Sequence, residues 1–443
     1  MKRLALIILL VMMTAAPVLA QGLSSENRRR GHRMLRQLRE QLEKHYYDTT
    51  YHGIDLERNA AKTDSAIDAA TSLAEMMGAL AQFLADLHDS HTSFVPPGLN
   101  VTVRYGWTPT VIGEDCYVLA VDPESDAAKK GLKVGDHVLA IDGIQPTRGN
   151  LPLIKYVYYL LSPRGGMQLV IEPRAGTRQE ITIDAKLERT SSRIDLDDVE
   201  QRRFLEEQIR LESNHPNHHV RTFADSVMVW RMHSFEGGRG KNGFDETVDH
   251  MMERARQHGH LILDLRGNPG GLIVTLRRLL GHFFAEEFEL GAQHTRDKVV
   301  PMMVQPIGDA PYQGDVVVLI DSQSASSAEI AARVLQMRGR ATIVGDRSAG
   351  AVMVSIYVPL VLGSEFQSRR VPFGLDVTVY DLVMSDGHSL EKVGVIPNIA
   401  VLPTGQDLAE KRDPAMAFAL ELAGVKLSAE EAGKIFKEDA ENR

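Results

Sequence analysis

The chain has 443 residues, 43% of them hydrophobic and 25% charged, a globular composition long enough for two or three domains. Its formal charge is −9, and it becomes about −11 without Lys2 and Arg3, which argues against nucleic acid or an anionic membrane surface as the main partner. The single cysteine, Cys116, excludes an intrachain disulfide, and its apolar surroundings are typical of a buried, inert thiol.

The first twenty residues have the pattern of a secretory signal. Lys2 and Arg3 precede an apolar run from Leu4 to Met13, and small residues then lead to Ala20, where we expect cleavage. The run is too short to span a bilayer, and no second hydrophobic stretch of that length follows. We therefore predict a protein that is exported, periplasmic or secreted, without stable insertion in a membrane.

Residues 21–97 are predicted to form an N-terminal helical domain, because apolar residues recur at helical spacing up to Leu84 and proline is absent before Pro96. From 98 to 190 short β-like runs alternate with turns and two short helical pieces, which indicates a β domain. Residues 191–225 are polar and charged, and we interpret them as a linker with a helix over 197–211. The linker also contains three histidines, predicted to be solvated rather than metal ligands: His215, His218 and His219.

Strands and helices alternate from 226 to 405, which predicts a parallel sheet flanked by helices. The expected strands are 227–232, 261–265, 316–320 and 341–344, with further β-like runs at 355–362, 375–383 and 399–402, and a helix is expected over 272–284. Residues 406–443 are predicted to form a charged helical tail on the surface.

The segment from Asp315 to Leu335, DVVVLIDSQSASSAEIAARVL, carries the strongest chemical signal. A buried strand, a serine-rich turn and a helix place hydroxyl groups at a helix N-terminus, where unpaired N–H groups favour negative charge. A serine nucleophile needs such donors for the oxyanion that its attack creates. The alternative is that the serines only cap the helix.

A second glycine-rich turn follows a predicted strand in the segment LILDLRGNPGGL, residues 261–272. Its glycines let backbone N–H groups approach a ligand closely, although a purely structural turn has the same pattern.

The β domain resembles a PDZ domain. The stretch SDAAKKGLKVGDHVLAIDG is distinctive of that family, and NLPLIKYVYYLL falls where the groove-lining helix is expected. The resemblance implies that an extended peptide is bound as an added strand near Tyr105, Gly106 and Trp107. That loop lacks the glycine-rich form that usually binds a terminal carboxylate. Two alternatives therefore stay open: the domain captures a peptide C-terminus, or it is a spacer without a ligand.

Together, the two turns and the segment SASSAEIAARVLQMRGRATIVGDRSAG resemble the catalytic core of the C-terminal processing (tail-specific) serine proteases. The resemblance implies a multidomain α/β protein with an N-terminal helical domain, a PDZ-like β domain and a ClpP/crotonase-like α/β protease core. It places the nucleophile at Ser326 and the oxyanion hole at the N–H groups of Ser327 and of Gly270 or Gly271. Ser324 and Ser327 are the competing nucleophiles.

The lysine base of the family's FGKG pattern is missing, because the matching residue is Ala351. Tricorn-like members of the superfamily use a histidine from the region before the PDZ domain, and Asp89-Ser90-His91-Thr92 resembles that context. The resemblance therefore implies His91 as general base, with the Ser90 hydroxyl orienting it. His88 is the runner-up, and a surface or capping role for His91 is the alternative.

Glu391 resembles the glutamate that completes the charge network in tricorn-like members, although a structural turn would also explain it, and Asn398 replaces the usual aspartate nearby. The resulting expectation is a serine-type peptidase (hydrolase) acting on a protein or peptide substrate, whose C-terminal segment is one candidate for the part recognised. No cofactor, metal or nucleic acid is expected, and a homo-oligomer is compatible with the resemblance. The alternative is an inactive exported protein that binds a peptide or a hydrophobic ligand on the same fold.

Overall fold

The computed structural model describes residues 23–98, 101–189, 218–223, 226–236, 243–363 and 371–436. The signal segment and the helix predicted over 197–211 lie outside these residues. No helix within the described residues has the length and apolar character needed to cross a membrane.

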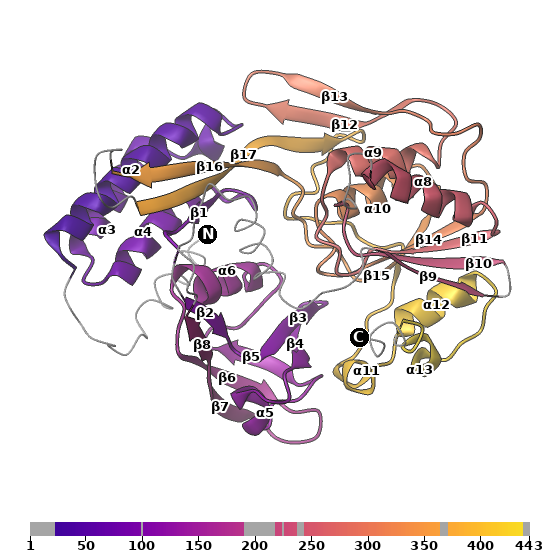
Figure 1. Cartoon of the computed structure of the whole chain (residues 1–443), viewed down its shortest axis with the longest axis horizontal. Coiled ribbons are helices and arrows are strands. Elements are labelled where there is room, and N and C mark those ends of the chain that lie inside the picture. Colours follow the sequence, from indigo (N-terminus) through magenta and orange to yellow (C-terminus); the bar gives the residue numbers. More distant parts are fainter. Residues whose placement is uncertain are drawn as a thin grey trace.

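Three helices form the N-terminal part, α2 (Ser25–His45), α3 (Leu56–Ala69) and α4 (Leu73–Ala85), with a short 3-10 turn η1 (Tyr51–Gly53) between the first two. Each helix starts at a polar cap, Ser24, Asp55 or Ser72, whose side chain accepts a first-turn N–H. Their apolar faces pack on the long ribbon of β16 (Val354–Leu362) and β17 (Val371–Met384), which shares one hydrophobic core with them. The N-terminal helices are therefore completed by strands from a distant part of the chain (Figure 1).

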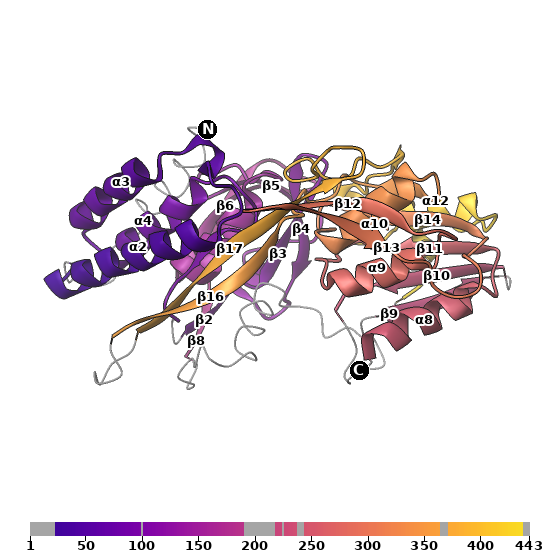
Figure 2. The ribbon, with the colours of Figure 1, turned by 90° about the horizontal axis from the view of Figure 1, so that it is seen from above.

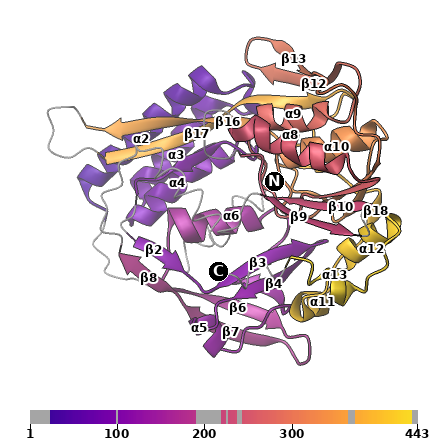
Figure 3. The same ribbon diagram turned by 45° about the vertical axis from the view of Figure 1, so that its right-hand side comes forward.

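The β domain contains a five-stranded antiparallel sheet in the order β3-β4-β5-β6-β7. Its strands are β3 (Trp107–Ile112), β4 (Asp115–Val121), β5 (His137–Ile141), β6 (Gly166–Glu172) and β7 (Gln179–Asp184), with helices α5 (Asp126–Lys129) and α6 (Leu151–Tyr156) and a π-helical turn η2 (Val157–Leu161). A separate two-stranded sheet pairs β2 (Val101–Arg104) with β8 (Lys186–Arg189). Strand β3 lies at the sheet edge and faces the rest of the molecule (Figure 3).

The core is a six-stranded sheet in the order β18-β15-β14-β11-β10-β9. Its strands are β9 (His218–Phe223), β10 (Val227–Met232), β11 (His260–Asp264), β14 (Asp315–Ile320), β15 (Thr342–Gly345) and β18 (Ile399–Ala400); all neighbours are parallel except β9 and β10. Helices α8 (Gly243–Ala255), α9 (Ile273–Gly281) and α10 (Ser327–Met337) belong to the same unit, and the side chains of α9 and α10 join a hydrophobic core with one face of the sheet. The expected parallel α/β core is present.

The predicted linker is wrong at its C-terminal end, because His218–Phe223 forms strand β9 of the core sheet. His218 and His219 are therefore not solvated: His218 Nδ1 accepts the Trp230 Nε1–H at 3.1 Å, and His219 is 8% exposed. Burial lowers the pKa of His218 to about 4. The polar, histidine-rich sequence is not typical of a buried strand, yet it forms an edge strand that packs on Trp230.

The C-terminal tail is helical as predicted, with α11 (Gly405–Glu410), α12 (Pro414–Leu422) and α13 (Ala429–Ala432), but it is not a surface appendage. Ala415, Met416, Ala419 and Leu420 of α12 are buried against the second face of the core sheet. The apolar segment PAMAFALEL covers a face that would otherwise expose valines and leucines to water.

A second sheet connects the units. It has the order β1-β17-β12-β13, with β16 also paired to β17, and includes β1 (Ser93–Val95), β12 (Phe288–Thr295) and β13 (Val299–Val304). Seen from above, the β16–β17 ribbon runs from the N-terminal helices toward the core (Figure 2). Because β1 pairs with β17, the loop just before β1 is carried to the core by this sheet.

Candidate active site

The serine-rich turn follows β14 and leads into α10, as the sequence predicts. Ser326 caps this helix with φ 54° and ψ −122°, a conformation that non-glycine residues adopt only under strain of about 1–3 kcal/mol. The Ser326 N–H is shared between two acceptors that hold this conformation, Ala351 O at 2.9 Å and Glu329 Oε2 at 3.1 Å.

The three candidate serines have different environments. Ser324 and Ser327 are fully buried, and their hydroxyls donate to the carbonyls of Leu265 and Gly271, both at 2.8 Å. Ser326 is partly exposed, and its hydroxyl donates to no acceptor within the described part of the chain. Of the three, Ser326 alone combines exposure with a free hydroxyl proton.

The glycine-rich turn lies directly against Ser326. A Cβ at Gly270, where φ is 98°, would lie 2.6 Å from the Ser326 Cβ and 3.0 Å from the Ser327 nitrogen, so only glycine fits. The Gly270 N–H donates to Asn268 Oδ1 at 2.8 Å, whereas no acceptor among the described residues receives the N–H of Gly271 or Ser327. Of the two glycines predicted for the oxyanion hole, Gly271 therefore has the available N–H.

Glu329, in the first turn of α10, organises the backbone around Ser326. It is fully buried and its carboxylate accepts four hydrogen bonds: from Ser326 N at 3.1 Å, Ala351 N at 2.8 Å, Gly350 N at 2.7 Å and Ser348 Oγ at 2.5 Å. Burial raises the pKa of Glu329, and these donors oppose that rise. The backbone at position 351, where the Ser–Lys pattern has its lysine, is thus fixed to the nucleophile.

The predicted base is in the loop between α4 and β1. His91 is half-buried, and its Nδ1 lies 2.6 Å from Ser90 Oγ, which in turn donates to Glu391 Oε2 at 2.9 Å. The three residues predicted to act together, His91, Ser90 and Glu391, are thus in one hydrogen-bonded chain although 301 positions separate Ser90 from Glu391.

This chain is connected to Ser326 through two consecutive residues. Ala351 O accepts the Ser326 N–H, and the next N–H, that of Val352, lies 3.3 Å from Glu391 Oε2. Residues 351 and 352 therefore bridge Ser326 and the His91 network.

Burial is the main influence on the pKa values of this network. It lowers the pKa of His91, an effect that the negative charge of Asp89 opposes. It raises the pKa of Glu391, and the Ser90 hydrogen bond opposes that rise. His88, the alternative base, is exposed; burial of part of its ring and the nearby Lys392 lower its pKa, and its carbonyl accepts the Lys392 ammonium.

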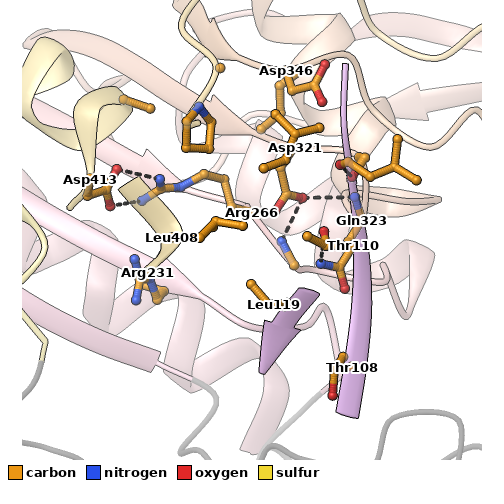
Figure 4. A pocket seen from close by; sticks show the side chains of 18 of the residues that line it. Thr108, Thr110, Leu119, Arg231, Arg266, Asp321, Gln323, Asp346, Leu408 and Asp413 are labelled. Carbon is orange, nitrogen blue, oxygen red and sulfur yellow. Dashed lines mark hydrogen bonds and ion pairs between the residues drawn. The ribbon is translucent and has the colours of Figure 1, made fainter. Parts of the chain in front are cut away.

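A cavity of about 1010 Å³ lies between the β domain and the core and reaches Gly270 and Gly271. Thr108, Thr110 and Val111 of β3 line one side of it, and the ion pair of Arg266 with Asp413 lines the other (Figure 4). Loop 321–323 closes on the strand, because the Ser322 hydroxyl donates to Val111 O and Gln323 Nε2 lies 3.3 Å from Thr110 Oγ1.

The residues predicted to bind peptide in the β domain lie beside this cavity rather than in it. Tyr105 and Trp107 are 1% and 5% exposed, and the Gly106 carbonyl accepts the Asp122 N–H at 2.9 Å. Their side chains pack inside the β domain, whereas the following residues of β3 face the cavity.

Sequence reasoning missed two residues that hold this site, Glu329 and Asn268. Glu329 lies three residues after Ser326, the spacing of a capping box, which could have indicated its contact with the Ser326 N–H. Nothing in the sequence pattern indicates that the Asn268 amide oxygen occupies the Gly270 N–H.

A strained serine at the start of a helix, beside a glycine turn with unpaired N–H groups, is the arrangement of a serine hydrolase. Residues 226–401 match the model of Peptidase family S41. The resemblance to C-terminal processing proteases, a class of serine peptidases, is confirmed.

Relatives with that name support the assignment. The chain is 27% identical over 298 residues to a carboxyl-terminal-processing protease of Synechocystis sp., covering 66% of this chain and 60% of the relative. It is 25% identical over 299 residues to the carboxy-terminal processing protease CtpB of Bacillus subtilis, covering 65% and 53%. The chain thus spans little more than half the length of these relatives.

Among solved structures, mature CPAF complexed with lactacystin has the same fold. It superposes with a TM-score of 0.66 at 16% identity, over 94% of this chain and 100% of that chain. The mixed α/β architecture is thereby confirmed. The choice of a histidine rather than a lysine base stays a prediction.

Proposed function

We propose that the protein is an exported serine peptidase that hydrolyses peptide bonds of protein or peptide substrates, with Ser326 as nucleophile and His91 as general base. The observation that carries the proposal is the bridge of Ala351 and Val352, which joins the strained, partly exposed Ser326 to the His91–Ser90–Glu391 chain. The names of the relatives support a processing role.

The reaction begins when Ser326 Oγ attacks the carbonyl carbon of the scissile peptide bond and its proton passes to His91. The carbonyl oxygen becomes an oxyanion, which accepts hydrogen bonds from the N–H groups of Gly271 and Ser327. The C–N bond then breaks, His91 returns the proton to the leaving amine, and an acyl-enzyme remains. Water, activated by His91, hydrolyses that ester and restores the serine.

Ser90 and Glu391 set which nitrogen of His91 is free. Because the Ser90 hydroxyl has one proton and donates it to Glu391, it accepts a hydrogen bond from a protonated Nδ1 of His91. Nε2 is then unprotonated and able to act as base. Since burial raises the pKa of Glu391, protonation of that carboxyl at low pH weakens it as an acceptor for Ser90 and so weakens the preference for the Nδ1-protonated tautomer of His91.

The substrate enters through the cavity beside β3. In a PDZ-like domain an extended peptide pairs with such an edge strand, and here the cavity continues from Thr108 and Thr110 to Gly270 and Gly271. A bound C-terminal segment would therefore lie in the same space as the scissile bond.

Purified full-length protein, its Ser326→Ala variant and its His91→Ala variant test this function. We expect the wild type to cleave an unfolded protein substrate and to be labelled by a fluorophosphonate probe, and both variants to lose cleavage by at least about 10³-fold while remaining folded. Full cleavage by Ser326→Ala would refute the nucleophile. A wild type that binds peptide but neither cleaves nor is labelled would instead indicate an inactive binding protein.

The pH dependence tests the base. Because the pKa of His91 is lowered by burial, activity should rise with pH below the ordinary histidine range and then level off. A profile that rises only above about pH 9 would instead indicate a lysine base.

A further inference from the structure

We propose that Asp89 is a positioning residue of this active site: its carboxylate fixes the loop that presents His91 and supplies the negative charge next to the imidazole. The inference rests on the proposed function, since it concerns the base of that reaction. It gives a role to a residue that forms no part of the His91–Ser90–Glu391 chain.

The carboxylate of Asp89 makes three hydrogen bonds within its own loop. Oδ1 accepts the N–H of His91 at 2.9 Å and the N–H of Thr92 at 2.5 Å, and Oδ2 accepts the Thr92 hydroxyl at 2.8 Å. The preceding residue, His88, has φ 57°, so the chain reverses sharply where the carboxylate is needed to hold it.

Thr92 extends this hold to the second sheet. It is 6% exposed, and its Oγ1 accepts the N–H of Thr378 in β17 at 3.1 Å. Asp89 therefore connects the base loop, through one buried hydroxyl, to the strand that also leads toward Glu391. Without the carboxylate, two backbone N–H groups lose their acceptor, the Thr92 hydroxyl is left to donate to Thr378 Oγ1 alone, and His91 loses its fixed position.

The charge of Asp89 has a second effect, because it is the charged group that raises the pKa of His91 against burial. The other charged or titratable groups around the loop are His88 on the loop itself, Glu391 and Lys392 on the facing turn, and Asp381 on β17, which accepts the Ser389 hydroxyl. Tyr46 and Tyr47, which follow α2, also face Asp89, and Asp48 lies next to these two tyrosines. Of these, Glu391 reaches His91 through the Ser90 hydroxyl. A carboxylate that does not take the proton still stabilises the imidazolium that forms in the transition state.

Asp48 offers a matched comparison. Its Oδ1 accepts the N–H and the hydroxyl of Thr50 at 2.9 and 2.7 Å, and its Oδ2 accepts the N–H of His52 at 2.6 Å. It accepts the same kinds of donor, two backbone N–H groups and one threonine hydroxyl, in a loop that does not present the base. A substitution there measures the cost of losing such a turn without touching His91.

The experiment measures kcat, KM and the pH profile of the full-length chain for Asp89→Asn, Asp89→Ala and Asp48→Ala, with Ser326→Ala as reference. Asparagine keeps an oxygen for the two N–H groups but has no charge, so kcat at the optimum should stay within about 10-fold of wild type. The acid limb of its profile should shift to lower pH, because the charge that raises the pKa of His91 is gone.

Asp89→Ala loses both the acceptor and the charge. We expect its kcat to fall about 10²-fold with little change in KM, the cost of a base misplaced by about an ångström, while Asp48→Ala remains close to wild type. Thermal unfolding establishes that each variant is folded; if Asp89→Ala is not, the shift of the acid limb in Asp89→Asn decides.

The outcomes distinguish a failure of the proposed function from a failure of the role of Asp89. If Ser326→Ala is as active as wild type, the proposed function fails whatever Asp89 does. If Ser326→Ala is inactive but Asp89→Ala has the kcat of Asp48→Ala, or Asp89→Asn leaves the acid limb in place, the role of Asp89 fails and the proposed function stands.

Discussion

Replacing Glu329 should destabilise the protein and inactivate it at the same time. Its buried carboxylate is the acceptor for the backbone of Ser326, Gly350 and Ala351 and for the Ser348 hydroxyl, at 2.5–3.1 Å. In Glu329→Ala the buried N–H groups of Gly350 and Ala351 lose their acceptor, each costing about 1–3 kcal/mol before water enters the space, whereas the Ser326 N–H still donates to Ala351 O. Relief from burying the carboxylate offsets part of this, so we expect a net loss of about 3 kcal/mol.

Glu329→Gln should lose less stability than Glu329→Ala. Its amide nitrogen fits best toward Ser348, whose hydroxyl can turn and accept, which leaves only the Gly350 N–H without an acceptor. We therefore expect about 1–2 kcal/mol from this variant. Because Ala351 links Ser326 to the His91 network, both variants should also lose most of their reaction with a fluorophosphonate probe.

Urea unfolding gives the stability, with Glu421→Gln on the exposed face of α12 as control, expected within about 0.5 kcal/mol of wild type. If both Glu329 variants unfold at the wild-type urea concentration and label at the wild-type rate, the carboxylate does not hold the loop as described. Loss of stability without loss of labelling would refute only the link between the Glu329 contacts and the reactivity of Ser326.

Three further outcomes follow from the structure. Ser324→Ala should keep cleavage within a few-fold and lose about 1–3 kcal/mol of stability, because its hydroxyl fixes the turn by donating to Leu265 O and accepting the Asp321 N–H. An inactive but folded variant would reopen the choice of nucleophile. Arg148→Ala should weaken the docking of the β domain on the core by about 3–5 kcal/mol, because it breaks the ion pair with Asp346, whose two side chains are only 9% and 10% exposed. A pattern of limited proteolysis identical to that of the wild type would contradict this. His218 has a pKa of about 4 in the folded protein, below its value in the unfolded chain. Its contribution to the free energy of unfolding is therefore complete above about pH 6.5 and falls by up to about 3 kcal/mol as the pH drops toward 4. His218→Gln, which keeps an acceptor but cannot be protonated, should flatten that part of the stability profile, and an unchanged profile would argue against it.

The core sheet could be predicted because its strands are continuous apolar runs with turns at both ends. Val227–Met232 forms a strand with the predicted bounds, and the strands expected at 261–265 and 341–344 are each displaced by one residue. The β12–β13 hairpin was not predicted, since β12 has mixed polarity, a register shift after Glu289 interrupts the pairing, and Pro301 lies inside the apolar β13. Strand β9 was mistaken for a linker because its side chains are polar, although Trp230 provides them with a buried partner.

The residue types of the site could be predicted from the resemblance, but their connection could not. Ser90, His91 and Glu391 were named as a set, and the structure brings them into one hydrogen-bonded chain. The bridge through Ala351 and Val352 uses backbone groups only, so no side-chain pattern identifies it. The state of the Gly270 N–H could not be predicted either. The glycine pattern suggests that this N–H is a free donor, but in the structure it donates to the Asn268 amide oxygen.

The pairing of β1 with β17 has a consequence for the nascent chain. His91 is synthesised early, yet the strand that receives its loop ends at Met384 and its partner Glu391 comes later still. A ribosome-bound chain that has already released the helices and the β domain therefore lacks the Ser90–Glu391 hydrogen bond. In the proposed mechanism, the imidazole of His91 is oriented for catalysis only after translation has passed Glu391.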